Sequence, residues 1–330
     1  MEKSVQHPFF VPKFACSQGH AAPLLVLQQH PTAYNQVLNQ CTTLGCYRDF
    51  LHGYTSPRVW IPRAYIDSFS CIEKYIVNHK FTHAYSGTII KEMLEEGFYI
   101  YYNGVDDFYL PGKSFFGTRH HHHDGIICGY DDNDKTFSIA AYDMNWVFNL
   151  IRVPQESFFI GIQSALESNI FGWLTAYKCK DIEVKLDEKL ILHHLIEYLN
   201  WDINAFPIDG EGRVHGTALH DYLAMYIGKL IDGSIPADKM DWRSLRPFWE
   251  HKRCMQERIE AVEKVREWDS TLSTEYAALV ERTNRIRMMY AMFHKNGKFA
   301  LLESIRREIL VLQEDEKIIL QKVIEKMEAK

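Results

Sequence analysis

Residues 119–143 read RHHHHDGIICGYDDNDKTFSIAAYD, and this stretch decides the first part of the fold. Two apolar runs, GIICGY and TFSIAAY, flank the acidic turn DDNDK, a pattern typical of an antiparallel β-hairpin. Counting outward from the turn, with Tyr130 opposite Thr136, places His123 opposite Asp143. Because cross-strand partners hold their Cβ atoms about 5 Å apart, the hairpin predicts a hydrogen-bonded imidazole and carboxylate.

A His–Asp pair takes part in covalent catalysis when a thiol lies beside it, and Cys16 is the best placed thiol. It precedes residues 17–29 (SQGHAAPLLVLQQ), which are predicted to be helical although Pro23 disturbs the first turns. The partial positive charge at a helix N-terminus stabilises a thiolate. We therefore predict a triad in which Cys16 attacks, His123 takes the proton and Asp143 orients the imidazole.

Each of these residues also has a purely structural interpretation. A cysteine before a helix is often a packing residue, and a His–Asp pair on a hairpin can be an incidental surface contact. The histidine run at residues 120–123 could bind a transition metal. Because alternating strand residues point to opposite faces, only His121 and His123 could easily share one site, and without a clear third ligand no metal is predicted. Asp106 and Asp107, after the aromatic run FYIYYN, are either turn residues or carboxylates that hold a substrate amine.

The chain changes character near residue 176. Before that point short helices alternate with strand-like runs, and after it almost everything has the apolar periodicity of helices, with no acid–base or metal motif. We therefore predict an α+β protein: an antiparallel sheet with an N-terminal helix in residues 1–176, followed by an all-helical part in residues 177–330. Strands are expected at 98–103, 125–130, 136–142 and 146–153, and helices at 86–96, 187–199, 215–231, 241–296 and 298–330.

Composition excludes several classes of function. The 330 residues are 46% hydrophobic, enough for a sizeable core. A net charge of −6 argues against nucleic acid as the main partner, because phosphate binding needs a basic face. No apolar run is long enough to span a membrane, and MEKSVQHPFF lacks the apolar stretch of a secretory signal. With no CxxC pair among seven cysteines, we expect reduced thiols and a cytoplasmic protein.

Several motifs together resemble a known family. Cys16, the stretch SGTIIKEMLEEGFYIYYNGVDDFYLPG (86–112) and the hairpin HDGIICGYDD…FSIAAYD resemble the papain-like, C39-like fold of the butirosin biosynthesis protein H family. HGTALHDYLAMYI and DWRSLRPFWEHKRCMQERI resemble the helical C-terminal segment of the branch encoded beside nonribosomal peptide and other carrier-protein assembly lines. The likeness covers most of the chain, and the amide-forming, protease-like enzyme of closthioamide assembly is similar in kind.

The resemblance implies acyl transfer from the phosphopantetheine thioester of an acyl or peptidyl carrier protein to a small-molecule amine, in secondary-metabolite biosynthesis. It carries over Cys16 as nucleophile, His123 as base and Asp143 as orienter, with no cofactor of the enzyme's own. C39-type sites have a Gln just before the cysteine as oxyanion donor, whereas FFVPKFA precedes Cys16 here. The candidates for oxyanion or substrate contacts are Gln18, Asp107 and Tyr109.

Other functions fit the same residues. A cysteine peptidase or thioesterase of this fold is one alternative, and a non-catalytic binding module is another. Because carrier proteins are acidic, a local basic patch is expected, with Arg58, Arg63 and Arg119 as candidates. The helical part is expected to cover or shape the site, or to form a homo-oligomer contact.

Overall fold

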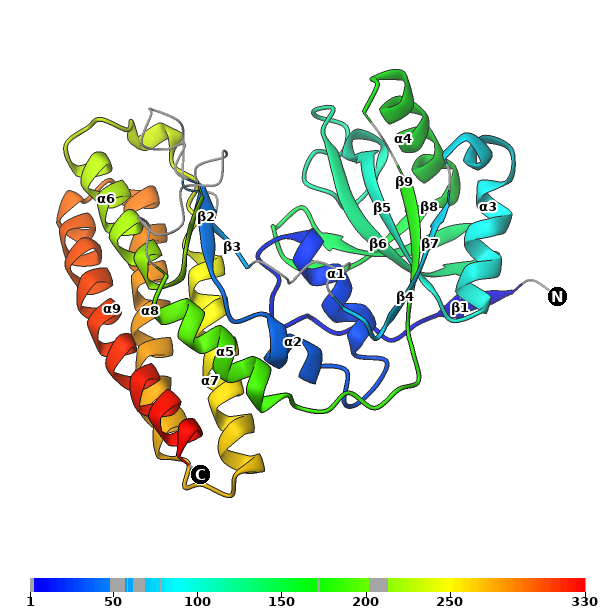
Figure 1. The fold of residues 1–330 in the computed structure, drawn as a ribbon. Coiled ribbons are helices and arrows are strands. Elements are labelled where there is room, and N and C mark those ends of the chain that lie inside the picture. Colours follow the sequence, from blue (N-terminus) through cyan, green and yellow to red (C-terminus); the bar gives the residue numbers. More distant parts are fainter. Residues whose placement is uncertain are drawn as a thin grey trace. The chain divides into compact units, whose positions relative to one another are not determined.

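The computed structural model describes residues 3–47, 57, 59–61, 69–77, 79–170, 173–201 and 213–329. It confirms a mixed α+β protein with an antiparallel sheet and a helical C-terminal part (Figure 1). The chain forms two compact units, the first of Met1–Tyr34 with Tyr65–Val184, and the second of Asn35–Ala64 with Lys185–Lys330. This division differs from a break at residue 176, because the last strand of the first unit continues through that point.

An antiparallel sheet organises the first unit. Among the described residues it has seven strands, and the short strand β1 (Ser4–Gln6) pairs with β6 beside the main path. The main path runs β4 (Ile72–Val77), β9 (Trp173–Cys179), β5 (Tyr99–Asp106), β6 (His122–Asp131), β7 (Thr136–Tyr142) and β8 (Phe148–Pro154).

Helices pack against both faces of this sheet. Apolar residues of α3 (His79–Glu95) and α4 (Gln155–Glu167) join alternate residues of β5 to β7, such as Ile100 and Ile127, in one buried core. Because successive strand residues point to opposite faces, Tyr101 points away from this core, toward α1 (Gln18–Leu27).

The predicted β6–β7 hairpin forms, but its register differs near the turn. Asp131, rather than Tyr130, pairs with Thr136, because the turn is one residue tighter than assumed. A β-bulge further along inserts one residue and restores the predicted count, so that Ile126 pairs with Ala140. The bulge, which the sequence pattern does not reveal, cancels the error in the turn.

The second unit is a helical assembly with a small sheet, so it is not all-helical as predicted. Its three strands, in the order β10 (Arg213–His215), β2 (Gly45–Tyr47) and β3 (Val59–Trp60), pair antiparallel. Its helices are α2 (Asn35–Gln40), α5 (Glu188–Leu199), α6 (Leu219–Ile231), α7 (Arg246–Val265), α8 (Thr271–Asn296) and α9 (Phe299–Glu328). Gly297, at φ 66°, ends α8 in the left-handed conformation that glycine adopts easily and lets α9 turn back along it. In the described part of the chain, no helix is long and apolar enough to cross a membrane.

Candidate active site

Cys16 lies directly before α1 and is partly exposed, where the sequence pattern places it. Its Sγ is 3.4 Å from Nδ1 of His20, and the Ser17 hydroxyl is 2.8 Å from the same nitrogen. Ser17 also caps α1, because its side chain accepts a hydrogen bond from the His20 backbone N–H. The structure thus brings His20 to the thiol. His20 was not predicted from the sequence. Cys16 lies outside the helix, before the extended N-cap Ser17, so helical spacing gives no signal for this contact.

His123, at the start of β6, bonds a different carboxylate from the predicted one. Its Nδ1 is 2.6 Å from Oδ2 of Asp107, whose side chain is 1% exposed, and its Nε2 is 2.9 Å from Nε2 of His121. An ionised carboxylate can only accept hydrogen bonds, so Nδ1 of His123 carries the proton and Nε2 is the basic nitrogen. Burial and the neighbouring His123 lower the pKa of His121, which keeps that ring neutral and able to donate to Nε2.

Asp143 is a turn residue in this structure. Pairing of β7 with β8 ends at Tyr142, and Oδ1 of Asp143 accepts hydrogen bonds from the backbone N–H groups of Asn145 and Val147, at 2.8 and 3.0 Å. Short acidic side chains often bond the backbone of a turn in this way. The backbone therefore occupies the carboxylate that was predicted to orient His123.

The two consecutive aspartates at the end of β5 have separate contacts. Asp106 is fully buried and accepts hydrogen bonds from His120 Nδ1 and Ser164 Oγ, both at 2.7 Å. Burial alone would raise the pKa of Asp106, but these bonds and two from the backbone lower it to about 2. Asp107 faces His123, and its Oδ1 lies 3.5 Å from Nζ of Lys113. Burial lowers the pKa of Lys113, although the charge of Asp107 opposes this effect.

The remaining candidate residues from the sequence lie in other contacts or outside the described residues. Within the described ranges, no group of three or more His, Cys, Asp and Glu residues is arranged to hold a metal ion. Tyr109 packs against the ring of His120, with centroids 5.9 Å apart. The guanidinium of Arg119 lies over the Phe115 ring at 4.3 Å. Arg58 and Arg63 lie outside the described residues.

Gln18, in the first turn of α1, ties the helix to the sheet. Its Nε2 donates to Oδ1 of Asp124 at 3.1 Å, while the Tyr101 hydroxyl donates to Oδ2 of the same carboxylate at 2.7 Å. Asp124 directly follows His123 on β6. This contact fixes the N-terminal end of α1, next to Cys16, on the strand that carries the histidine.

A cavity of about 540 Å³ lies beside this first turn of α1. Ser17, the residue after Cys16, contributes to its wall, as does the Asp124 carboxylate. The aromatic side chains of Tyr101, Trp173 and Tyr177, from β5 and β9, form much of the remaining wall. The space is large enough for a small organic molecule, and the residue after Cys16, rather than Cys16 itself, is part of its wall.

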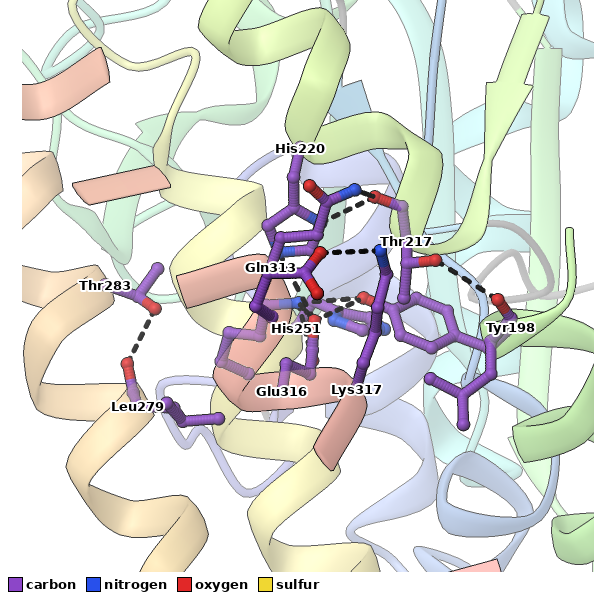
Figure 2. Close-up of polar contacts among 12 residues, drawn as sticks. Tyr198, Thr217, His220, His251, Leu279, Thr283, Gln313, Glu316 and Lys317 are labelled. Carbon is purple, nitrogen blue, oxygen red and sulfur yellow. Dashed lines mark hydrogen bonds and ion pairs between the residues drawn. The ribbon is translucent and has the colours of Figure 1, made fainter. Parts of the chain in front are cut away.

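The helical unit contains a second polar cluster, which the sequence analysis did not foresee. Lys252 donates to both carboxylate oxygens of Glu316 at 2.7 Å and to the Tyr198 hydroxyl at 2.8 Å. Tyr276 also donates to this carboxylate. Nε2 of His220 lies 3.3 Å from it, and His220 and Glu316 are labelled in Figure 2. All five side chains are buried. Burial would raise the pKa of Glu316, but Lys252 and His220 lower it far below its ordinary value.

The sequence matches no protein-family model, and no curated protein matches it.

Proposed function

We propose that this protein is a cysteine-dependent acyltransferase of papain-like type, which moves an acyl group from a carrier-bound thioester to an amine. The observation that carries the proposal is the position of Cys16: a thiol at the N-terminus of α1, 3.4 Å from an imidazole nitrogen and one residue from the wall of a cavity. A helix N-terminus and a neighbouring imidazole are the two features that favour a thiolate nucleophile.

The acylation step uses Cys16 and His20. His20 takes the thiol proton, the thiolate attacks the thioester carbonyl, and a new C–S bond forms between the acyl group and Cys16. The bond to the pantetheine sulfur breaks, and that sulfur leaves with the proton returned by His20. One thioester replaces another, so the acyl group stays activated.

The second step uses the pair His123–Asp107. An amine attacks the acyl-enzyme, its proton passes to Nε2 of His123, and the bond to Cys16 breaks to release an amide and the thiol. Asp107 supports this role because its 2.6 Å hydrogen bond fixes the tautomer and favours the imidazolium. His121 holds Nε2 until the proton donor of the substrate replaces it. In this proposal Asp107 takes the part that the sequence predicted for Asp143.

Intact-protein mass spectrometry with acetyl-, hexanoyl- and benzoyl-pantetheine tests the proposal. The wild type should gain the mass of one acyl group, and Cys16→Ala should gain none. Cys128→Ala is the matched control, because Cys128 is a fully buried thiol of the same unit whose pKa is raised by burial. It should acylate like the wild type. Acylation of Cys16→Ala, or no acylation of the wild type by any of the three thioesters, would contradict the proposal.

Two histidine variants separate the steps. His20→Asn should slow acylation, whereas His123→Asn should acylate normally and then react slowly with added amine. Rapid hydrolysis of the wild-type acyl-enzyme with no amide from any amine would instead identify a thioesterase of the same fold.

A further inference from the structure

We propose that the cavity beside α1 binds the ammonium group of an amine whose remaining part is apolar, with Asp124 as its counterion. The inference deepens the proposed function and rests on it, because the acyl-transfer reaction identifies this amine as the acyl acceptor. The bound ammonium group loses one proton to solvent before its nitrogen attacks the acyl-enzyme, and the neutral amine then gives a second proton to His123. The binding itself follows from the wall of the cavity and does not need Cys16.

The carboxylate of Asp124 is oriented for a cationic ligand. One hydrogen bond from Gln18 and one from Tyr101 hold its two oxygens in place. A carboxylate has about four lone-pair sites, so these two bonds leave acceptor capacity for an ammonium group. Burial and the charge of Asp124 raise the pKa of Tyr101, so its hydroxyl remains a donor to the carboxylate and not a competing charge.

Pro23 is an unusual residue of the same wall. It lies inside α1, where its ring nitrogen has no hydrogen to donate to the carbonyl oxygen of Gly19, four residues earlier. Gly19 and Pro23 both line the cavity, and a proline inside a helix costs stability. Close by, Oε1 of Gln18 is buried and has no hydrogen-bond partner among the described residues, while its Nε2 donates to Asp124.

Aromatic and apolar side chains complete the site. The rings of Tyr101 and Tyr177 lie side by side, with centroids 6.1 Å apart, and aromatic faces attract cations electrostatically. Trp173 and Ile76 are 42% and 68% exposed, which is unusual for large apolar residues that line a cavity. An apolar ligand body would cover these side chains and be stabilised by their burial.

Other charges act on the same space. Lys74, an exposed residue of β4, also lines the cavity, and the buried Lys113 interacts electrostatically with Asp124. Lys113 interacts with two carboxylates, the buried Asp107 and the half-buried Asp124, and its Nζ lies 3.5 Å from Oδ1 of Asp107. One lysine therefore serves two carboxylates, and an ammonium group beside Asp124 would add a second positive charge there.

Isothermal titration calorimetry at pH 7.5 with four amines and their matched alcohols tests the inference. The probes are ethylamine, 2-phenylethylamine, 4-phenylbutylamine and tryptamine, each compared with the alcohol of the same skeleton. At least one amine should bind about tenfold or more tightly than its alcohol, as expected for a charge-assisted hydrogen bond. Asp124→Asn should remove this preference, and Trp173→Ala should weaken the amine and the alcohol alike.

Three further variants keep the test independent of folding and of catalysis. Asp134→Asn removes an exposed carboxylate of the same unit and should bind like the wild type. Cys16→Ala should also bind like the wild type, because the site does not require the thiol. If its thermal melt shows that Asp124→Asn does not fold, Tyr101→Phe replaces it in the test. Tyr101→Phe loses only the hydroxyl that bonds the Asp124 carboxylate, and it should reduce the preference for the amine. Equal affinity for all amines and alcohols would overturn the inference while leaving an observed acyl-enzyme intact.

Discussion

At the scale of single residues, the site depends on which carboxylate reaches His123. A count along the hairpin favours Asp143, but backbone N–H groups of the following turn bind that carboxylate. Asp107 reaches the histidine because β5 has an irregularity before Val105, which places the end of β5 beside the start of β6. The sequence shows an acidic residue after an aromatic strand, but it does not show a bulge. The positions of Cys16 and His123 were therefore predictable, whereas the partner of His123 was not.

The two aspartates make a matched pair for a test. Asp107→Asn should leave acylation of Cys16 unchanged and slow the reaction with amine by about 10² to 10⁴-fold, because a neutral amide stabilises imidazolium poorly. Asp143→Asn should change the amine reaction by less than about threefold, since an asparagine oxygen can still accept the turn hydrogen bonds. Single-turnover kinetics on the isolated acyl-enzyme measure both rates. The opposite ranking of the two variants would return the orienting role to Asp143.

At the scale of elements, strands with clear alternation were predictable and helix contacts were not. The strand β7 lies where its apolar run predicts it. The strand β6 includes the whole of its predicted range, residues 125–130, and extends a few residues beyond that range. The helix α4 was missed, although it supplies Ser164 to Asp106 and packs on β5. The helix α4 approaches β5 most closely at Gly161. An added Cβ there would come within 2.9 Å of Val105 Cγ1 and 3.1 Å of the Asp106 carbonyl oxygen. Such closeness between a helix and a strand is a tertiary property, which local sequence periodicity does not encode.

Gly161→Ala tests this contact against an ordinary helical glycine. Alanine usually favours a helix, but here we expect a loss of about 1 to 3 kcal/mol of unfolding free energy, as in other overpacked cores. The shift of β5 should also displace Asp107 and slow the amine reaction. Gly228→Ala is the control, because a Cβ at this position in the last turn of α6 would meet Arg306 at an ordinary 3.8 Å and should be neutral or stabilising. Urea unfolding of both variants decides the matter, and a stabilised Gly161→Ala would show that α4 packs more loosely than described.

At the scale of the whole molecule, both units bury charged groups beside an apolar core. The first unit buries Asp106, Asp107 and Lys113 as well as the apolar core between sheet and helices, and the second buries Lys252 and Glu316. Helical periodicity predicted most helices of the second unit, because an apolar stripe is visible in sequence. It did not predict the buried cluster, since Lys252 and Glu316 are far apart in sequence and each resembles a surface residue of an amphipathic helix. Charged residues become a buried pair only through tertiary packing.

His251, in the same unit, makes this packing sensitive to pH. Its Nε2 donates to the Thr42 carbonyl at 2.7 Å, and its ring stacks on Tyr198 (Figure 2). Burial, and then the charge of Lys252, lower the pKa of His251 to about 3. A folded-state pKa below the unfolded value means that unfolding takes up a proton. The stabilisation is therefore complete above about pH 6.5 and is lost as the pH falls from there toward 3.

His251→Gln should reduce this dependence, because glutamine can still donate to Thr42 but has no proton to gain. The wild type should lose about 1.4 kcal/mol more unfolding free energy per pH unit than the variant between about pH 6 and 4.5. Comparing the two proteins removes the contribution of other titratable groups to the pH dependence of the unfolding free energy. One of these groups is Glu316, whose lowered carboxyl pKa also reduces stability as the pH falls, but at lower pH. Urea unfolding at several pH values, followed by tryptophan fluorescence, provides the two slopes. Parallel slopes for the two proteins would mean that His251 titrates in the folded state as it does in water, and that the cluster around Glu316 is open to solvent.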